Sequence, residues 1–195
     1  MLLTPGPTAV PEFVRTAMSG ETLHHRTPEF ENIFKNTREL LLELFDLPEA
    51  VMLASSGTGA MEACITNLTH KKALTINSGK FGERFGKICD AHNIPFTEIK
   101  HEWNIPASIQ EITNIVQNDN EIDAIFIQIC ESAGGLRHPV EDIAKAVKNI
   151  NKDISIVADG ITAVGVEKID TTNIDALITG SQKALMLPPG LSMIG

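Results

Sequence analysis

The chain has 195 residues, 43% of them hydrophobic, and a formal net charge of −9. This length is enough for one domain with a sizeable core, and the negative charge without any Lys/Arg block argues against a nucleic-acid binder. No apolar run approaches the roughly 20 residues that a membrane span needs, so we expect no membrane segment.

The N-terminal part predicts an arm followed by two helices. Residues 1–9 are rich in proline and predict an extended arm. They lack the basic start and long apolar stretch of a secretory signal peptide, so we do not expect one. Pro11 opens a short predicted helix that ends at Met18. The clearest helix covers residues 28–45, where apolar residues recur at helical spacing.

From residue 50 onward, predicted strands and helices alternate. The strands cover residues 50–54, 73–77, 95–99, 122–130, 154–158 and 174–179, and another begins at 191–194. The helices cover residues 60–68, 81–92, 106–117 and 139–150. This alternation predicts an α/β fold of three αβα layers, with a mostly parallel sheet between helices. The nearly unbroken apolar run 122–130 is typical of a strand that is covered on both faces.

Ligands of such folds bind at the carboxyl ends of the strands. The loops after Ala54, Cys130, Ala158 and Thr179 are therefore where we expect chemistry.

Lys183 follows the strand predicted at 174–179, within the segment 180–190 (GSQKALMLPPG). Partial desolvation there would lower the pKa of its ammonium group and free the neutral amine that a Schiff-base lysine needs. The alternative is an ordinary surface lysine whose stem lies along apolar neighbours.

Residues 55–59 (SSGTG) join a predicted strand to a predicted helix. Glycines allow a ligand to approach the backbone, and a helix N-terminus offers free N–H groups to an anion such as a phosphate. The segment is neither a Walker sequence nor a full G-x-G-x-x-G. A plain Ser/Thr helix cap with a glycine turn is the alternative.

Further candidates lie at other predicted strand ends. Asp159 follows the strand at 154–158, where its carboxylate could keep a ring nitrogen protonated, or where it could simply make a turn. Phe81 lies between glycines where a helix opens, and could stack on a planar ligand or belong to the core. The small residues of 131–135 (ESAGG) suit close packing against a ring.

Together these parts meet the requirements of pyridoxal 5'-phosphate (PLP): its phosphate, ring face, pyridine nitrogen and aldehyde. Over essentially its whole length the chain resembles the class V, fold-type I, PLP-dependent aminotransferases, most closely the alanine–glyoxylate / serine–pyruvate branch. The resemblance lies in residues 3–7 (LTPGP), 24–30 (HHRTPEF), 56–63 (SGTGAMEA), 79–85 (GKFGERF), Asp159 with its turn, and 180–191.

The resemblance implies a role for each candidate. Lys183 would carry the cofactor, and Asp159 would pair with the pyridinium nitrogen. Phe81 and Ile161 would cover opposite faces of the ring. The phosphate site would comprise Ser56, Gly57, Thr58 and Gln182. The loop at residues 5–7 would approach the substrate.

One stretch departs from the family pattern. Relatives often have Glu-(Ser/Thr)-Ser-Thr-Gly after the long strand, and here Ala133 stands at a position whose hydroxyl can contact the cofactor. That contact is therefore either lost or taken over by Ser132.

The implied activity moves an amino group from a small amino acid (alanine or serine type) to a 2-keto acid (glyoxylate or pyruvate type) by a ping-pong mechanism, in a homodimer. The family usually continues for roughly as many residues again. We therefore expect an arm and short helix over 1–20, and a PLP-binding large domain over 21–195 that is incomplete at its C-terminal end, with the small domain absent. The missing part normally supplies the arginine that grips the substrate carboxylate, so we expect this chain alone to be inactive.

The three cysteines, Cys64, Cys89 and Cys130, are isolated in apolar patterns. They predict buried thiols in a reducing, cytoplasmic compartment rather than a disulfide framework or a metal site. The scattered histidines also argue against a metal site. Three alternatives stay open: another PLP enzyme of this fold (a lyase, a desulfurase or an aminoethylphosphonate transaminase), a non-catalytic module, and a nucleotide-binding domain.

Overall fold

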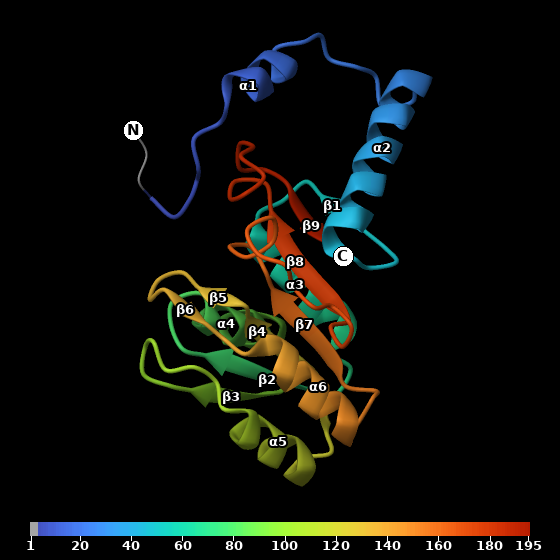
Figure 1. Ribbon diagram of the computed structural model, residues 1–195. Coiled ribbons are helices and arrows are strands. Elements are labelled where there is room, and N and C mark those ends of the chain that lie inside the picture. Colours follow the sequence, from blue (N-terminus) through green and yellow to red (C-terminus); the bar gives the residue numbers. More distant parts are fainter. Residues whose placement is uncertain (1–3) are drawn as a thin grey trace.

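A seven-stranded sheet forms the centre of the computed structural model, which describes residues 4–195 (Figure 1). Residues 1–3 of the predicted arm lie outside the described part. The strand order is β1-β9-β8-β7-β4-β2-β3. The strands are β1 (Val51–Leu53), β2 (Lys72–Asn77), β3 (Phe96–Lys100), β4 (Ile122–Gln128), β7 (Ser155–Asp159), β8 (Ala176–Gly180) and β9 (Ser192–Ile194).

The strands of this sheet share one direction, except for β9. Parallel pairs join β2 to β3 and β4, β4 to β7, and β7 to β8. Strand β9 is antiparallel to both of its neighbours, so β1 on its far side runs in the common direction again. The carboxyl ends of all strands but β9 therefore meet at one edge of the sheet.

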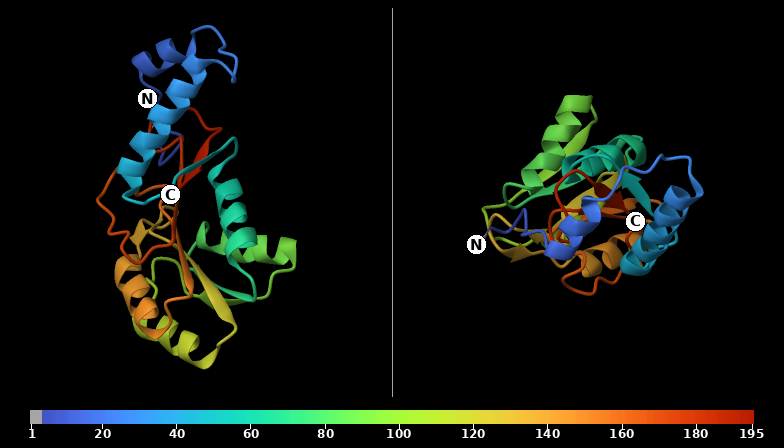
Figure 2. Two further views of the ribbon diagram at one scale, coloured as in Figure 1. Left: turned by 90° about the vertical axis from the view of Figure 1, so that its right-hand side faces the viewer. Right: turned by 90° about the horizontal axis from the view of Figure 1, so that it is seen from above.

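Helices cover both faces of the sheet. Helices α3 (Gly57–Leu68) and α4 (Gly82–His92) lie on one face, and α5 (Ile109–Asn118) and α6 (Val140–Ile150) on the other (Figure 2). This arrangement confirms the predicted αβα layers and the mostly parallel sheet. Among the described residues, no helix combines the length and apolar character that crossing a membrane requires.

The sheet divides the core into two clusters because successive side chains of a strand point to opposite faces. In β4, Ile125 and Ile127 pack with α5 and α6, whereas Ala124 and Phe126 pack with α3 and α4. The ring of Phe126 lies 5.4 Å from that of Phe85 on α4, measured between centroids. Apolar residues on both faces are what the unbroken apolar run of this strand predicts.

The N-terminal helices project beyond the sheet (Figures 1 and 2). Helix α1 (Glu12–Met18) buries none of its residues, and α2 (Pro28–Phe45) buries only Leu41 and Phe45 at its C-terminal end. Most of the apolar side chains on these two helices are therefore in contact with solvent.

Several predicted boundaries are wrong. Helix α5 begins at Ile109 and not at residue 106, and most other ends differ by one or two residues. The strand predicted over 122–130 ends at Gln128, and Cys130–Glu131 forms a separate strand, β5, that pairs with β6 (Leu136–Arg137). Apolar composition continues through this point, so it does not reveal the change of partner. The predicted turn at 55–59 is also shorter than expected, because α3 begins at Gly57 and its first helical turn includes both glycines.

We expect Phe126→Ala to lower the free energy of unfolding by about 3–5 kcal/mol, because it removes a fully buried ring from a close-packed core. Phe13→Ala is the matched control: that side chain is 73% exposed, and its change should stay within about 0.5 kcal/mol. Urea denaturation of the three proteins measures both effects. Equal losses would contradict the placement of Phe126 in the core.

Candidate active site

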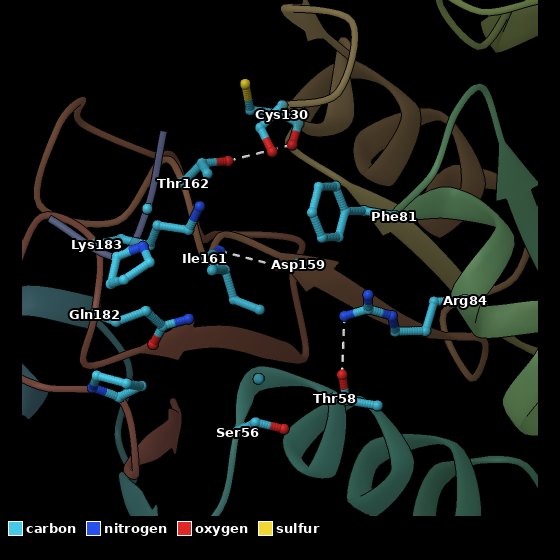
Figure 3. A pocket seen from close by; sticks show the side chains of 15 residues that line it. Ser56, Thr58, Phe81, Arg84, Cys130, Asp159, Ile161, Thr162, Gln182 and Lys183 are labelled. Atoms are coloured by element: carbon cyan, nitrogen blue, oxygen red, sulfur yellow. Dashed lines mark hydrogen bonds between the residues drawn. The ribbon is translucent and has the colours of Figure 1, made fainter. Parts of the chain in front are cut away.

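A cavity of about 320 Å³ opens at the carboxyl-end edge of the sheet (Figure 3). All of the predicted site residues line it: Ser56, Gly57, Thr58, Phe81, Ser132, Asp159, Ile161, Gln182 and Lys183. The other residues in its wall are Gly6, Pro7, Arg84, Cys130, Thr162 and Pro189. Its volume lies in the range of small-molecule sites.

The N-terminus of α3 forms one wall of the cavity. Ser56 is the N-cap residue, but its side chain makes no capping hydrogen bond. The plain Ser/Thr helix cap considered as the alternative therefore does not describe this hydroxyl. The amides of Gly57 and Thr58 belong to the first helical turn, which has no acceptor within the helix. A Cβ on Gly57 would lie 2.2 Å from Cδ1 of Ile161, so only glycine lets these walls approach so closely. The result is a set of N–H donors suited to an anion.

Asp159 ends strand β7 at the base of the cavity and is only 5% exposed. Its Oδ1 accepts a hydrogen bond from the Ile161 N–H at 2.9 Å, which is the turn interaction considered above. The other oxygen has no hydrogen-bond partner among residues 4–195.

Burial raises the pKa of Asp159 from 3.8 to about 6. The Ile161 hydrogen bond and the charge of Arg84 oppose this rise, Glu131 adds to it, and Lys183 opposes it. The carboxyl group is therefore still mainly ionised at neutral pH and can pair with a protonated ligand nitrogen.

Lys183 follows β8, and the N-terminal arm holds it from the other side. Its Nζ donates a hydrogen bond to the carbonyl oxygen of Pro5 at 3.0 Å. A Cβ on Gly6 would lie 2.6 Å from the Lys183 amine and stem, so the arm passes directly against this side chain. The Thr8 hydroxyl donates to the Lys183 carbonyl at 2.8 Å, and the Thr8 N–H donates to the Gln182 carbonyl at 3.0 Å. Partial burial lowers the pKa of the Lys183 ammonium group, while Asp159 and Cys130 oppose that shift.

Phe81 and Ile161 project toward the middle of the cavity from opposite sides (Figure 3). Phe81 is the N-cap residue of α4, and Arg84 lies in the first turn of that helix. The guanidinium carbon of Arg84 is 5.1 Å from the centroid of the Phe81 ring. The same guanidinium donates a hydrogen bond to the Thr58 hydroxyl at 2.9 Å. The cavity thus has two apolar faces, and Arg84 links one of them to the α3 N-terminus.

Several residues of the cavity wall were not predicted from the sequence. Arg84 could have been found, because a residue three positions after Phe81 on a helix lies on the same side. Cys130 was predicted to be buried, but it is only partly buried and lines the cavity; Cys64 and Cys89 are buried as predicted. Burial raises the pKa of the Cys64 thiol to about 12 and that of Cys89 to about 11. Thr162 donates its hydroxyl to the Cys130 carbonyl at 3.2 Å, which joins the two missed segments.

Ser132 lies in the cavity wall. Its hydroxyl is therefore placed where it could replace the one that relatives have at the position of Ala133. Ala133 has a backbone role instead, because its N–H donates to the Glu131 carboxylate at 3.1 Å. Within the described part of the chain, no cluster of three or more His, Cys, Asp or Glu side chains has the arrangement to hold a metal ion.

Comparison with known proteins gives consistent matches along the chain. A family model described as "Aminotransferase class-V" matches residues 8–194. A Helicobacter pylori protein described as an uncharacterized aminotransferase is 52% identical over 194 residues, covering 100% of this chain and 53% of that protein. The L-aspartate–glyoxylate aminotransferase of Paracoccus denitrificans is 29% identical over 201 residues, covering 100% of this chain and 51% of that enzyme.

A solved structure agrees with these matches. The aspartate aminotransferase of Thermus thermophilus has a TM-score of 0.90 at 29% identity, covering 97% of this chain and 55% of that one. The chain spans about half the length of the curated relatives that it matches.

The environment of Asp159 predicts how stability depends on pH. Its pKa is about 6 in the folded protein and 3.8 when unfolded, so between these values the folded state binds more protons. The contribution of this residue to the unfolding free energy should therefore fall by about 2–3 kcal/mol as pH rises from 4 to 7. Asp159→Asn removes the contribution.

Urea denaturation at several pH values measures this contribution as the difference between the wild type and Asp159→Asn. The variant should gain stability over the wild type as pH rises. A difference that stays constant from pH 4 to 7 would show that the carboxyl group of Asp159 is not perturbed by burial.

Proposed function

The chain belongs to the class V aminotransferase family, and on that premise we propose that its cavity binds PLP for transfer of an amino group between a small amino acid and a 2-keto acid. The family implies the cofactor. The observation that carries the proposal is the meeting of a partly buried lysine, a buried carboxylate and an open helix N-terminus in one cavity.

The residues present fit this cofactor. The N–H groups at the start of α3, with Ser56, Thr58 and the Gln182 amide, suit the phosphate. Because Gly57 has no Cβ, Ile161 can pack against the start of α3, and the cavity between Ile161 and Phe81 is where a ring would lie. We assign Asp159 to the pyridine nitrogen and Lys183 to the aldehyde. Residues 21–195 would form the cofactor-binding domain, and residues 1–20 the arm and short helix.

When bound, PLP supplies an electron sink for the electrons of the substrate Cα–H bond. Asp159 is ionised at neutral pH and would keep a proton on the ring nitrogen. Partial burial favours the neutral amine of Lys183, which would then take the proton from the substrate Cα and return it as general base and acid. The carbonyl of Pro5 would hold this amine in position through the hydrogen bond already present.

For the substrates we propose an alanine- or serine-type donor and a glyoxylate- or pyruvate-type acceptor. The name of the Paracoccus relative supports glyoxylate as acceptor, although its named donor is aspartate. An aminoethylphosphonate transaminase, a lyase or desulfurase of the same fold, and a non-catalytic module are the alternatives, and screening of amino donors against keto acceptors separates them.

A second copy of this chain is the proposed partner. The apolar side chains of Phe13, Ile33, Phe34 and Leu40 on α1 and α2 are all about half or more exposed, which is typical of surfaces that another chain covers. Sedimentation of the purified chain tests whether it forms a dimer.

Incubation with PLP followed by borohydride should attach one cofactor covalently to Lys183, because reduction fixes the bond between the amine and the aldehyde. Lys183→Ala should abolish this attachment. Lys87→Ala is the control, since Lys87 pairs with Glu83 on the surface of α4 at 2.8 Å and should leave it unchanged. Peptide mass spectrometry locates the modified lysine. Labelling of Lys183→Ala to the same extent as the wild type would refute the assignment.

These 195 residues alone should catalyse transamination from alanine or serine to glyoxylate only weakly. The only guanidinium in the described cavity wall is that of Arg84, which bonds Thr58 and lies over Phe81, so we assign it to the wall beside the proposed phosphate site and not to a substrate carboxylate. An assay of glyoxylate consumption with added PLP measures the rate. Rapid turnover by the purified chain would contradict this expectation.

A further inference from the structure

Glu131 is a buried carboxylate that none of the roles above uses. It ends the short strand β5 and is 1% exposed. Its Oε2 accepts the N–H groups of Phe81 and Gly82, both at 2.8 Å. Its Oε1 accepts the Ala133 N–H at 3.1 Å. Three backbone donors therefore surround one carboxylate, which lies between Cys130 and Ser132 of the cavity wall in the chain but does not itself line the cavity.

This carboxylate acts as the cap of α4. The helix begins at Gly82, and its N-cap residue, Phe81, has no side-chain acceptor to satisfy the free amides of the first turn. Glu131 supplies that acceptor from a segment 49 residues further along the chain. A negative charge at a helix N-terminus also interacts favourably with the helix dipole, and hydrogen bonds to an ionised acceptor are stronger than neutral ones.

The backbone around Phe81 is shaped to receive Glu131. A Cβ on Gly79 would lie 2.6 Å from Cγ and 2.7 Å from Cδ of Glu131. Because the Glu131 side chain is buried, it has no space into which it could move away. Glycine at position 79 is therefore what allows the carboxylate to reach the amides of Phe81 and Gly82.

We propose that Glu131 is a positioning residue that fixes the ring of Phe81 over the cavity. The hydrogen bond to the Phe81 amide holds the backbone from which the ring projects, and the Arg84 guanidinium restrains the ring itself. This inference rests on the proposed function, in which Phe81 stacks on the cofactor ring. It differs from a purely structural role, because it requires the effect of Glu131 on cofactor binding to pass through Phe81.

The first measurement uses the protein without cofactor. Glu131→Gln keeps the size of the side chain but removes its charge and replaces one acceptor oxygen by an NH₂ donor. Amide hydrogen exchange at Phe81, Gly82 and Ala133 should accelerate about tenfold, while amides deeper in α4, such as that of Cys89, should be unchanged. The matched control is Glu83→Gln, a partly exposed carboxylate in the first turn of the same helix. Unchanged exchange at Phe81 and Gly82 would overturn the proposal.

The second measurement is the dissociation constant for PLP, read from its visible absorbance, in a double-mutant cycle with Phe81→Leu. Glu131→Gln should weaken binding about tenfold in the wild type and less than about twofold in Phe81→Leu. Equal weakening in both backgrounds would show that Glu131 does not act through Phe81, and would overturn the proposal.

Gly79→Ala provides an independent route to the same result if Glu131→Gln fails to fold. It should displace the carboxylate and weaken PLP binding by a similar factor, whereas Gly20→Ala, where a Cβ would meet only one backbone oxygen at 3.5 Å, should not. A wild type that does not bind PLP would refute the proposed function and this inference together. A wild type that binds PLP, with Glu131→Gln and Gly79→Ala unaffected, would refute this inference alone.

Discussion

The common direction of the strands is the constraint on which the site depends. Because β1, β2, β4, β7 and β8 run the same way, the segments that follow them meet at one edge, although they are far apart in the sequence. Strand β9 reverses between β8 and β1, and this reversal lets β1 contribute the α3 N-terminus to the same edge as Asp159 and Lys183. Helices on both faces exclude water from the sheet. The polar groups at its carboxyl-end edge lie next to this dry core and are therefore only partly hydrated.

Desolvation shifts the pKa values of Asp159 and Lys183 in opposite directions. It disfavours the charged form of each, so the pKa of Asp159 rises and that of Lys183 falls. The attraction between the two groups opposes both shifts, and Arg84 supports the ionised form of Asp159. The outcome is a carboxylate that is still charged at neutral pH near an amine that loses its proton more easily than a surface lysine does. The hydrogen bonds at Ile161 and Pro5 orient each group.

Much of the fold could be predicted from the sequence, because apolar periodicity and alternation are local signals. The helix at Pro28–Phe45 has the predicted bounds, and Lys183 and Asp159 follow from the strand-end argument together with the family resemblance. What could not be predicted depends on pairs of distant segments. The β5–β6 hairpin arises from a change of partner within an apolar run, and the bond from Glu131 to the α4 N-terminus joins residues with no spacing signal. The resemblance placed the loop at residues 5–7 near the substrate, but the contact of Gly6 with Lys183 is seen only in the three-dimensional structure.

The hydrogen bond from Lys183 to Pro5 spans 178 positions of the sequence. During synthesis the arm leaves the ribosome before Lys183, which emerges only after the central strands have been made. Closing so long a loop carries a large entropic cost, so this contact should form late, once the sheet has already brought its two ends together. The Lys183 amine should therefore gain its backbone acceptor late in folding, and until then the cavity lacks the wall that the arm contributes through Gly6 and Pro7.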